Sequence, residues 1–310
     1  MREGATVATV SVSVEGRVLR LSNLDKDLYP QVGFTKGEVI DYYVAVAPYL
    51  LPRLAGRPLT LRRYPDGAGG EGFYEKHAAR HAPSWVRTVM LPTRHTQSDP
   101  TGPTETEYVL LEDLPGLVWA ANLAALELHV PQWTMAEDGG RGLPDLMVFD
   151  LDPGPPADIV ACCRVAELLH EALAEDGLPA WAKTSGSKGM QLYVPVTVDA
   201  VPDTSEYAKR MCLRLARSHP DLVVGTMAKQ ARPGRVYIDW SQNHQAKTTI
   251  AAYSLRARQE PTVSTPLTWA EVRACQRAEE LVFTASDVRK RLDTHGDLLA
   301  DLDTEHYPLP

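Results

Sequence analysis

Apolar residues recur at intervals of three and four in several segments, which is the pattern of helices with one buried face. The clearest segment predicts a helix over 35–50, where Thr35 and Glu38 have the spacing of a capping box and Pro52 is expected to end the helix. The same pattern predicts helices over 114–125 and from the Pro155-Pro156 pair to about Glu175. A further helix is predicted from about Asp203 to Ser218, with Glu206 at cap spacing from Asp203. The last predicted helices follow Thr268, which has Glu271 at cap spacing, and occupy part of the charged tail beyond Ser286.

Short apolar runs bounded by Gly, Pro and polar residues predict strands over 59–64, 108–111, 126–130, 145–152, 181–184, 190–196, 235–240 and 248–253. The run within 145–152 ends at Pro153-Gly154 and is apolar enough to be a buried strand. Strands that alternate with helices indicate an α/β (α+β) fold. Polar loops are expected over 66–72 and 92–106, but no linker appears. We therefore expect a single domain over 1–310, with an accessory module over about 1–130 and a larger module over about 131–310.

The composition is that of an ordinary folded protein, with 44% hydrophobic and 23% charged residues among 310. No apolar run reaches the roughly 18 residues of a membrane-spanning helix, and the N-terminal segment lacks the core of a signal peptide. We therefore expect a cytoplasmic protein without a membrane partner. The four cysteines form no C-x-x-C pair, so they predict buried thiols rather than a zinc site or a disulfide framework.

The net charge of −8 by itself disfavours nucleic acid, but the charge is unevenly distributed. Residues 205–258 contain ten Lys or Arg and three Asp or Glu, a net +7, which leaves −15 for the remainder. This asymmetry indicates a local basic surface on an acidic protein. For the helical part, 209–217, a solvated helix face is an equal alternative.

Asp150 and Asp152 lie two apart on a predicted strand, so both side chains face the same side. Adjacent carboxylates repel each other, and a shared divalent cation such as Mg²⁺ or Mn²⁺ would remove that cost. Asp239 ends another apolar strand and would complete the three carboxylates of a two-metal phosphoryl-transfer site. The alternative is solvated aspartates at strand ends.

The segment Ser185-Gly186-Ser187-Lys188-Gly189 predicts a tight turn between two strands. Its glycines allow positive φ and close backbone approach, its serines and N–H groups could donate to phosphate oxygens, and Lys188 would supply charge. The spacing is not that of a Walker loop. A plain hairpin with a surface lysine is the alternative.

In combination, these motifs resemble the polymerase domain of bacterial DNA ligase D, which belongs to the archaeo-eukaryotic primase superfamily. The order and spacing of 149–154, 185–189 and 237–243 are similar to those of the three primase motifs. The resemblance covers almost the whole chain through further segments at 24–30, 56–58, 73–76, 126–133, 247–256 and 264–267.

The resemblance implies an archaeo-eukaryotic primase fold, with an RRM-like catalytic sheet and a packed N-terminal α/β module that binds DNA ends. It implies a DNA-directed polymerase or primase that fills gaps and extends ends in bacterial non-homologous end joining, with a preference for ribonucleotides. It also implies two Mn²⁺ or Mg²⁺ ions, an NTP or dNTP substrate, gapped or overhanging DNA ends with a 5′-phosphate, and Ku and a DNA ligase as partners. No ligase or nuclease sequence follows Pro310, so we expect a stand-alone protein or an excised domain.

The resemblance assigns a role to each matching residue. It makes Asp150, Asp152 and Asp239 the metal-binding catalytic triad. It places around the nucleotide His129, Ser185, Lys188, Gln191, Gln242 and Arg256. It assigns Lys26 and Lys36 to the 5′-phosphate of a DNA end, and Phe73 and Tyr74 to stacking on template bases. Considered singly, His129 and the aromatic pair could be core residues, and the two lysines could be solvated surface charges.

Gln191 departs from the family pattern S-G-x-K-G-x-H, which ends in histidine. Glutamine cannot carry a proton to the leaving pyrophosphate, so the rate is expected to fall by about 10²–10⁴-fold. The alternative function is therefore a catalytically weakened module that binds or bridges DNA ends. A D-x-D after an apolar strand is also typical of haloacid-dehalogenase-type phosphatases, but there Gly-Thr normally follows, whereas this chain has Pro153-Gly154.

Overall fold

The computed structural model describes residues 9–93 and 104–310, so most of the loop expected over 92–106 lies outside the described residues. The chain divides into two compact units. The N-terminal unit comprises Met1–His129 and Leu255–Pro261, and the C-terminal unit comprises Val130–Ser254 and Thr262–Pro310. The N-terminal unit thus includes a short segment from much later in the sequence.

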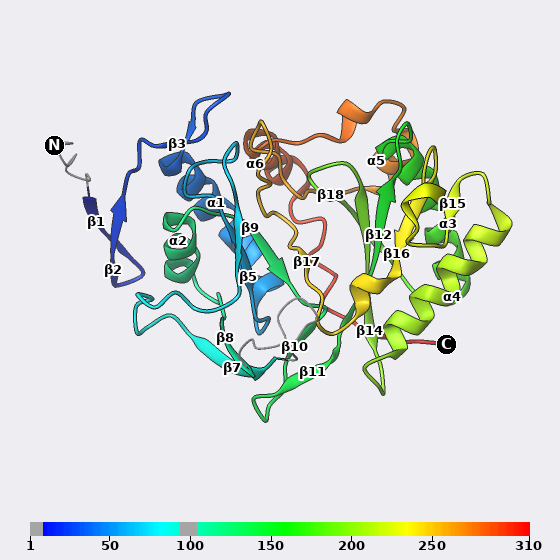
Figure 1. Cartoon of the computed structure of the whole chain (residues 1–310), viewed down its shortest axis with the longest axis horizontal. Coiled ribbons are helices and arrows are strands. Elements are labelled where there is room, and N and C mark those ends of the chain that lie inside the picture. Colours follow the sequence, from blue (N-terminus) through cyan, green and yellow to red (C-terminus); the bar gives the residue numbers. More distant parts are fainter. Residues whose placement is uncertain (1–8, 94–103) are drawn as a thin grey trace. The chain divides into compact units, whose positions relative to one another are not determined.

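A seven-stranded sheet forms the centre of the C-terminal unit, in the order β15-β16-β12-β14-β13-β18, with β19 pairing β14 (Figure 1). Its strands are β12 (Leu146–Pro153), β13 (Trp181–Thr184), β14 (Met190–Thr197), β15 (Val223–Val224), β16 (Val236–Asp239), β18 (Pro266–Leu267) and β19 (Tyr307–Pro308). β12 pairs antiparallel with β14 on one side and with β16 on the other. It is therefore the buried inner strand that its apolar sequence predicts. The unit also contains β10 (Trp133–Met135), β11 (Arg141–Pro144) and β17 (Thr249–Ile250).

Helices cover one face of this sheet. The helices of the unit are α3 (Ile159–Glu175), α4 (Asp203–Ser218), α5 (Trp269–Ala274) and α6 (Ala285–His295), with short 3₁₀ helices η1 (Lys229–Ala231), η2 (Trp240–Asn243) and η3 (Ala278–Leu281). Phe149 and Leu151 of β12 share a core with Leu169 of α3 and Met211 of α4, and Figure 1 shows both helices beside these strands. Because side chains alternate along a strand, the aspartates at 150 and 152 point to the opposite face.

The N-terminal unit combines small sheets with two helices that pack on each other, α1 (Lys36–Leu54) and α2 (Leu114–Asn122) (Figure 1). Its strands are β1 (Thr9–Val14), β2 (Arg17–Ser22), β3 (Asp27–Tyr29), β4 (Phe34–Thr35), β5 (Thr60–Arg63), β6 (Phe73–Glu75), β7 (Thr88–Pro92), β8 (Glu105–Val109) and β9 (Ala125–Val130). β5 lies between β6 and β9, and the pairs β1–β2, β3–β4 and β7–β8 form hairpins. No helix in the described part of the chain is long and apolar enough to cross a membrane.

The helix caps largely follow the sequence. Thr35 with Glu38 and Thr268 with Glu271 form the predicted capping boxes. The prediction that Pro52 ends α1 is wrong, because the helix continues to the fully buried Leu54 and the N–H of Ala55 still reaches the carbonyl of Leu51 at 3.0 Å.

Several other boundaries differ from the sequence prediction, among them the ends of β8 at Val109 and of α2 at Asn122. α3 begins at Ile159 because Asp158 caps it, so the Pro155-Pro156 pair precedes the helix. Asp203 is inside α4 rather than at its cap, and its carboxylate accepts from the N–H of Ala200. The strand expected over 248–253 is limited to β17, after which the backbone turns.

Candidate metal and nucleotide site

Three carboxylates meet on the face of the C-terminal sheet opposite the helices. Asp150 of β12 lies directly across from Asp239 of β16, and Asp152 follows two residues along β12. One carboxylate oxygen of each residue lies within 4.8 Å of the other two. The structure therefore brings together the three aspartates that the sequence analysis grouped.

Electrostatics make this cluster unfavourable without a cation. Burial raises the pKa of Asp150 to about 7, and the neighbouring Asp152 contributes to the rise. Burial and the charge of Asp239 raise the pKa of Asp152. Asp150 and Asp152 thus resist ionisation beside their acidic neighbours. A divalent cation would remove this repulsion, and three carboxylate groups are hard oxygen donors that fit Mg²⁺ or Mn²⁺.

A polar row crosses four strands at the level of Asp150. The register aligns Lys183 of β13 with Gln191 of β14, then Gln191 with Asp150, then Asp150 with Asp239. The side-chain amide of Gln191 donates to Asp150 Oδ1 at 3.0 Å. Its Oε1 atom is buried and has no hydrogen-bond partner within the described residues.

Lys183 is a member of this row that the sequence analysis missed. Its side chain is fully buried and donates to Ser264 Oγ at 2.6 Å and to the carbonyl of Ile250 at 3.1 Å. The signal that could have identified it is its position opposite Gln191 in the hairpin that flanks the loop 185–189. Its positive charge lowers the pKa of Asp150, which burial raises.

Polar groups also hold the other two aspartates. Asp239 Oδ1 accepts from Ser241 Oγ at 2.6 Å, and Oδ2 accepts from Gln242 Nε2 at 3.0 Å. Arg232, which the sequence analysis did not single out, lies 3.9 Å from Asp152 Oδ2 and stacks over the ring of Tyr237. Gln191 and Gln242 are thus bound to carboxylates of the cluster.

The loop 185–189 is a tight turn that contacts β12. Ser185 Oγ accepts from the N–H groups of Ser187 and Gly189, both at 3.3 Å, so these two amides are already bound within the turn. Gly186 has a positive φ of 66°. Gly189 is needed for another reason, because a Cβ there would lie 2.0 Å from the carbonyl oxygen of Leu151. The exposed Lys188 lowers the pKa of Asp152, though burial and Asp239 outweigh it.

His129 and Arg256 belong to the N-terminal unit, where both contact a residue that the sequence analysis assigned no role. Glu127 lies 3.0 Å from His129 Nε2 and 3.3 Å from Arg256 Nε. Burial alone would raise the pKa of Glu127, but the hydrogen bond from His129 and the charge of Arg256 lower it to about 2. Glu127 is thus ionised while its side chain is 1% exposed.

The residues predicted to bind DNA also lie in the N-terminal unit. Lys26 is partly exposed and lies 3.3 Å from Asp66, whereas Lys36 is buried and donates to the carbonyl of Ser22 at 2.7 Å. Burial, followed by the charges of Lys26 and Arg63, lowers the pKa of Lys36 to about 8. The two lysines therefore share one electrostatic environment.

The aromatic pair lies on β6 and is solvent-accessible, with Phe73 45% and Tyr74 58% exposed. Each ring lies next to an arginine of β5, Arg63 at 5.3 Å from Phe73 and Arg62 at 5.1 Å from Tyr74. Both rings are therefore open to a stacking partner and adjacent to positive charge.

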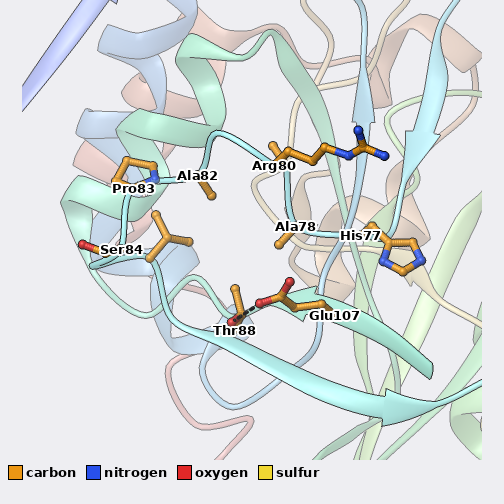
Figure 2. Close-up of a pocket in the computed structure, with 10 residues that line it drawn as sticks. His77, Ala78, Arg80, Ala82, Pro83, Ser84, Thr88 and Glu107 are labelled. Atoms are coloured by element: carbon orange, nitrogen blue, oxygen red, sulfur yellow. Dashed lines mark hydrogen bonds between the residues drawn. The ribbon is translucent and has the colours of Figure 1, made fainter.

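A surface pocket of about 740 Å³ also lies in the N-terminal unit. Figure 2 shows lining residues of this pocket, among them His77, Arg80 and Pro83, and Glu107 accepting a hydrogen bond from Thr88. None of the residues predicted to bind DNA or nucleotide lines this pocket.

The chain is similar in sequence to known proteins over most of its length. Residues 35–299 match the model of the LigD primase-polymerase domain family. The chain is 43% identical to the multifunctional non-homologous end joining protein LigD of Mycolicibacterium smegmatis, over 93% of this chain and 36% of that protein. It is 30% identical to the bifunctional non-homologous end joining protein LigD of Bacillus subtilis, over 90% of this chain and 43% of that protein. The chain thus spans less than half of these relatives.

A solved structure, the polymerase domain from Mycobacterium tuberculosis ligase D in complex with DNA, is similar over its whole length. It is 40% identical, with a TM-score of 0.85, and the match covers 94% of this chain and 100% of that one. This likeness confirms the expected mixed α/β fold and decides against the phosphatase alternative. The chain belongs to the LigD primase-polymerase domain family.

Proposed function

We propose that this chain is a template-dependent nucleotidyl transferase that adds nucleotides to the 3′ end of a DNA primer. One observation carries the proposal: in a chain of this family, three carboxylates from β12 and β16 present oxygens within 4.8 Å of one another. Such a cluster suits nucleotidyl transfer because both the attacking hydroxyl and the triphosphate require compensation of negative charge.

We propose that Asp150, Asp152 and Asp239 hold two Mg²⁺ or Mn²⁺ ions. When bound, these ions would supply the Lewis acidity that lowers the pKa of the primer 3′-hydroxyl and offsets triphosphate charge. The contribution of the protein is orientation. Gln191 fixes Asp150 and Gln242 fixes Asp239, as polar neighbours commonly orient metal-binding carboxylates.

Each unit, taken by itself, contains side chains that we propose contact the nucleotide. Lys188 is exposed beside Asp152, which supports a role against the phosphates, and Ser185 shapes the turn that carries Lys188. His129 and Arg256 are proposed nucleotide contacts in the N-terminal unit. Since Gln191 and Gln242 are bonded to aspartates, we propose that they act through these carboxylates rather than by touching the nucleotide.

We further propose that DNA ends bind to the N-terminal unit. A 5′-phosphate would neutralise the combined charge of Lys26 and Lys36. Such a phosphate contact fixes the position of the DNA end independently of its base sequence. The exposed rings of Phe73 and Tyr74 offer stacking surfaces for template bases. The solved relative, a ligase D polymerase domain, is named as a complex with DNA, which supports this part of the proposal.

The biological setting is proposed from the relatives, which are named as non-homologous end joining proteins. We propose that this chain fills gaps and extends overhangs at 5′-phosphorylated ends in the bacterial cytosol, with Ku and a DNA ligase as partners. We also propose a preference for ribonucleotides. The repair setting and the ribonucleotide preference both follow from family resemblance. The preference is tested by running the extension assay with NTPs and dNTPs in parallel.

Primer extension on a gapped, 5′-phosphorylated duplex with Mn²⁺ tests the proposed function. Asp239→Asn should reduce extension by roughly 10³-fold or more while DNA-end binding is retained. Asp199→Asn, the same change at an exposed turn position, is the matched control and should extend at the wild-type rate. Extension by Asp239→Asn at a rate close to wild type would refute the assignment of the triad.

Gln191 supports a second candidate, an end-binding module with little chemistry, because its amide is bound to Asp150 and carries no transferable proton. The same assay separates the two functions, since template-dependent incorporation removes the second. If loss of a proton donor limits the rate, Gln191→His should raise extension by about 10²-fold or more. An unchanged or lower rate would mean that orientation of Asp150 is the role of this position.

A further inference from the structure

Glu127 is an ionised carboxylate that is almost completely buried. It lies on β9, in which every residue is buried, and its side chain is 1% exposed. A buried charge without partners is strongly unfavourable, so such a group is retained only where its partners compensate it. Glu127 has partners on both oxygens, and they come from three segments of the N-terminal unit.

The contacts join side chains that are far apart in sequence. Oε2 lies 3.0 Å from His129 Nε2 and 3.5 Å from a terminal nitrogen of Arg62 on β5. Oε1 lies 3.3 Å from Arg256 Nε and accepts from the N–H of Ala257 at 3.2 Å. The β5–β9 register aligns Arg62 with Glu127 and Thr60 with His129, so β5 and β9 fix two of these partners. One carboxylate thus connects β9, β5 and the segment Leu255–Pro261.

From this geometry we propose that Glu127 is a positioning residue for nucleotide binding, which fixes the tautomer of His129 and the orientation of Arg62 and Arg256. This inference rests on the proposed function, because it concerns residues expected to contact the nucleotide. Glu127 itself does not touch the substrate in this proposal. It acts by holding His129 and Arg256, the two proposed nucleotide contacts of this unit, together with Arg62, which lies beside Tyr74.

The tautomer follows from donor and acceptor chemistry. A carboxylate only accepts hydrogen bonds, so His129 must carry its proton on Nε2. Burial lowers the pKa of His129 more than Glu127 raises it, so the ring is neutral near pH 7. Nδ1 is then an acceptor. A neutral acceptor suits a ligand hydroxyl, whereas it cannot donate to a phosphate oxygen, so His129 in this arrangement recognises a hydroxyl of the sugar.

Glu127→Gln tests the proposal with little change of shape. The probes are ATP and 2′-deoxy-ATP, each with Mn²⁺ and without DNA, so that affinity is measured in the absence of turnover. We expect the variant to bind ATP about ten- to a hundredfold more weakly, as hydrogen bonds to charged groups are the strong ones. We also expect a smaller difference between ATP and 2′-deoxy-ATP. Altered packing alone would weaken both nucleotides equally.

Glu75→Gln is the matched control, because Glu75 is a partly buried carboxylate on β6, the strand on the other side of β5, and pairs with Arg63 of β5 at 2.9 Å. It should leave both affinities unchanged. Nitrogen-15 NMR of the wild-type imidazoles gives a second test that does not depend on folding of the variant. His129 should be protonated at Nε2 at pH 7, and protonation at Nδ1 would overturn the proposal.

The outcomes for this inference and for the proposed function are distinct. If wild-type protein extends primers but Glu127→Gln binds both nucleotides as wild type does, the positioning role is wrong and the polymerase function stands. If wild-type protein shows no Mn²⁺-dependent extension on any gapped duplex, the proposed function fails first. Weaker ATP binding with loss of sugar discrimination in Glu127→Gln supports the positioning role.

Discussion

Gly189→Ala tests whether the loop 185–189 and the aspartate pair depend on one close backbone contact. Gly186 needs to be glycine for its positive φ, whereas Gly189 has no positive φ and is limited by space. A Cβ at position 189 would lie 2.0 Å from the carbonyl oxygen of Leu151 and 3.3 Å from Cδ of Pro153. Leu151 lies between Asp150 and Asp152, so a displacement of its backbone moves both carboxylates.

The size of the effect follows from the required displacement. Unbonded carbon and oxygen atoms do not approach much closer than 3.0 Å, so the loop or β12 must move by about 1 Å. Overpacking in a well-packed region typically costs about 1–3 kcal/mol, which lowers Tm by about 3–10 °C. A misplacement of about 1 Å in an active site typically lowers the rate by about 10²-fold. We therefore expect a modestly destabilised protein with a much larger loss of extension.

Thermal unfolding measures the loss of stability, and Mn²⁺ affinity and primer extension, both measured below the Tm of the variant, measure the effect on the aspartates. Gly69→Ala is the control, because a Cβ at Gly69 has no neighbour within 4 Å and its φ is not positive. That variant should match wild type in all three measurements. Wild-type Mn²⁺ affinity and extension rate in Gly189→Ala would refute the claim that the loop supports the aspartates.

Three further predictions concern two buried charged residues, Lys36 and Glu127, and one residue of the hydrophobic core, Leu169. Because the pKa of Lys36 is about 8, the preference for a 5′-phosphate over a 5′-hydroxyl end, roughly tenfold at pH 7, should decrease above pH 8. Lys36→Gln should weaken this preference at pH 7, while Lys26 still contacts the phosphate. Equal ratios of the two Kd values at pH 7 and pH 9.5 in the wild type would contradict the role of Lys36. The folded-state pKa of Glu127, about 2 against an ordinary 4.5, gives about 3 kcal/mol of stability that is present above pH 4.5 and lost as the pH falls toward 2. The free energies of unfolding of the wild type and Glu127→Gln, measured with urea, should therefore converge as the pH falls from 4.5 toward 2. A difference that stays constant over this interval would exclude the stabilising role of the Glu127 charge. Leu169→Ala, in the core between α3 and the sheet, should lose about 2–5 kcal/mol in urea unfolding while the folded variant keeps its Mn²⁺ affinity.

Local patterns predicted much of the C-terminal sheet because its strands obey simple rules. The apolar run before Asp150 marked β12 as an inner strand, and the two-residue spacing placed Asp150 and Asp152 on one face. The capping boxes that begin at Thr35 and Thr268 could be predicted because, in each box, the threonine and the glutamate lie three residues apart in the sequence. Each of these features depends on neighbours in sequence.

Features that depend on tertiary packing were not predictable in the same way. Pro52 does not end α1, since burial of Leu54 stabilises a last turn that the local rule excludes. The compensation of Glu127 by Arg62 and Arg256 requires the β5–β9 register and the inclusion of Leu255–Pro261 in the N-terminal unit. No local motif contains that information.

Gln191 illustrates how strand register changes the interpretation of a motif. In the sequence motif, Gln191 occupies the position where the family pattern has histidine, so the motif alone predicts that a proton donor is lost. In the sheet it is the residue opposite Asp150, and its amide holds that carboxylate while Lys183 lies on its other side. A protonated histidine has two ring N–H donors, so one could hold Asp150 while the other carries a proton toward a leaving group, whereas the glutamine amide can only hold the carboxylate. Glutamine at this position therefore keeps the orientation of Asp150 and lacks acid–base capacity, and the extension rate of Gln191→His measures how much that capacity would contribute.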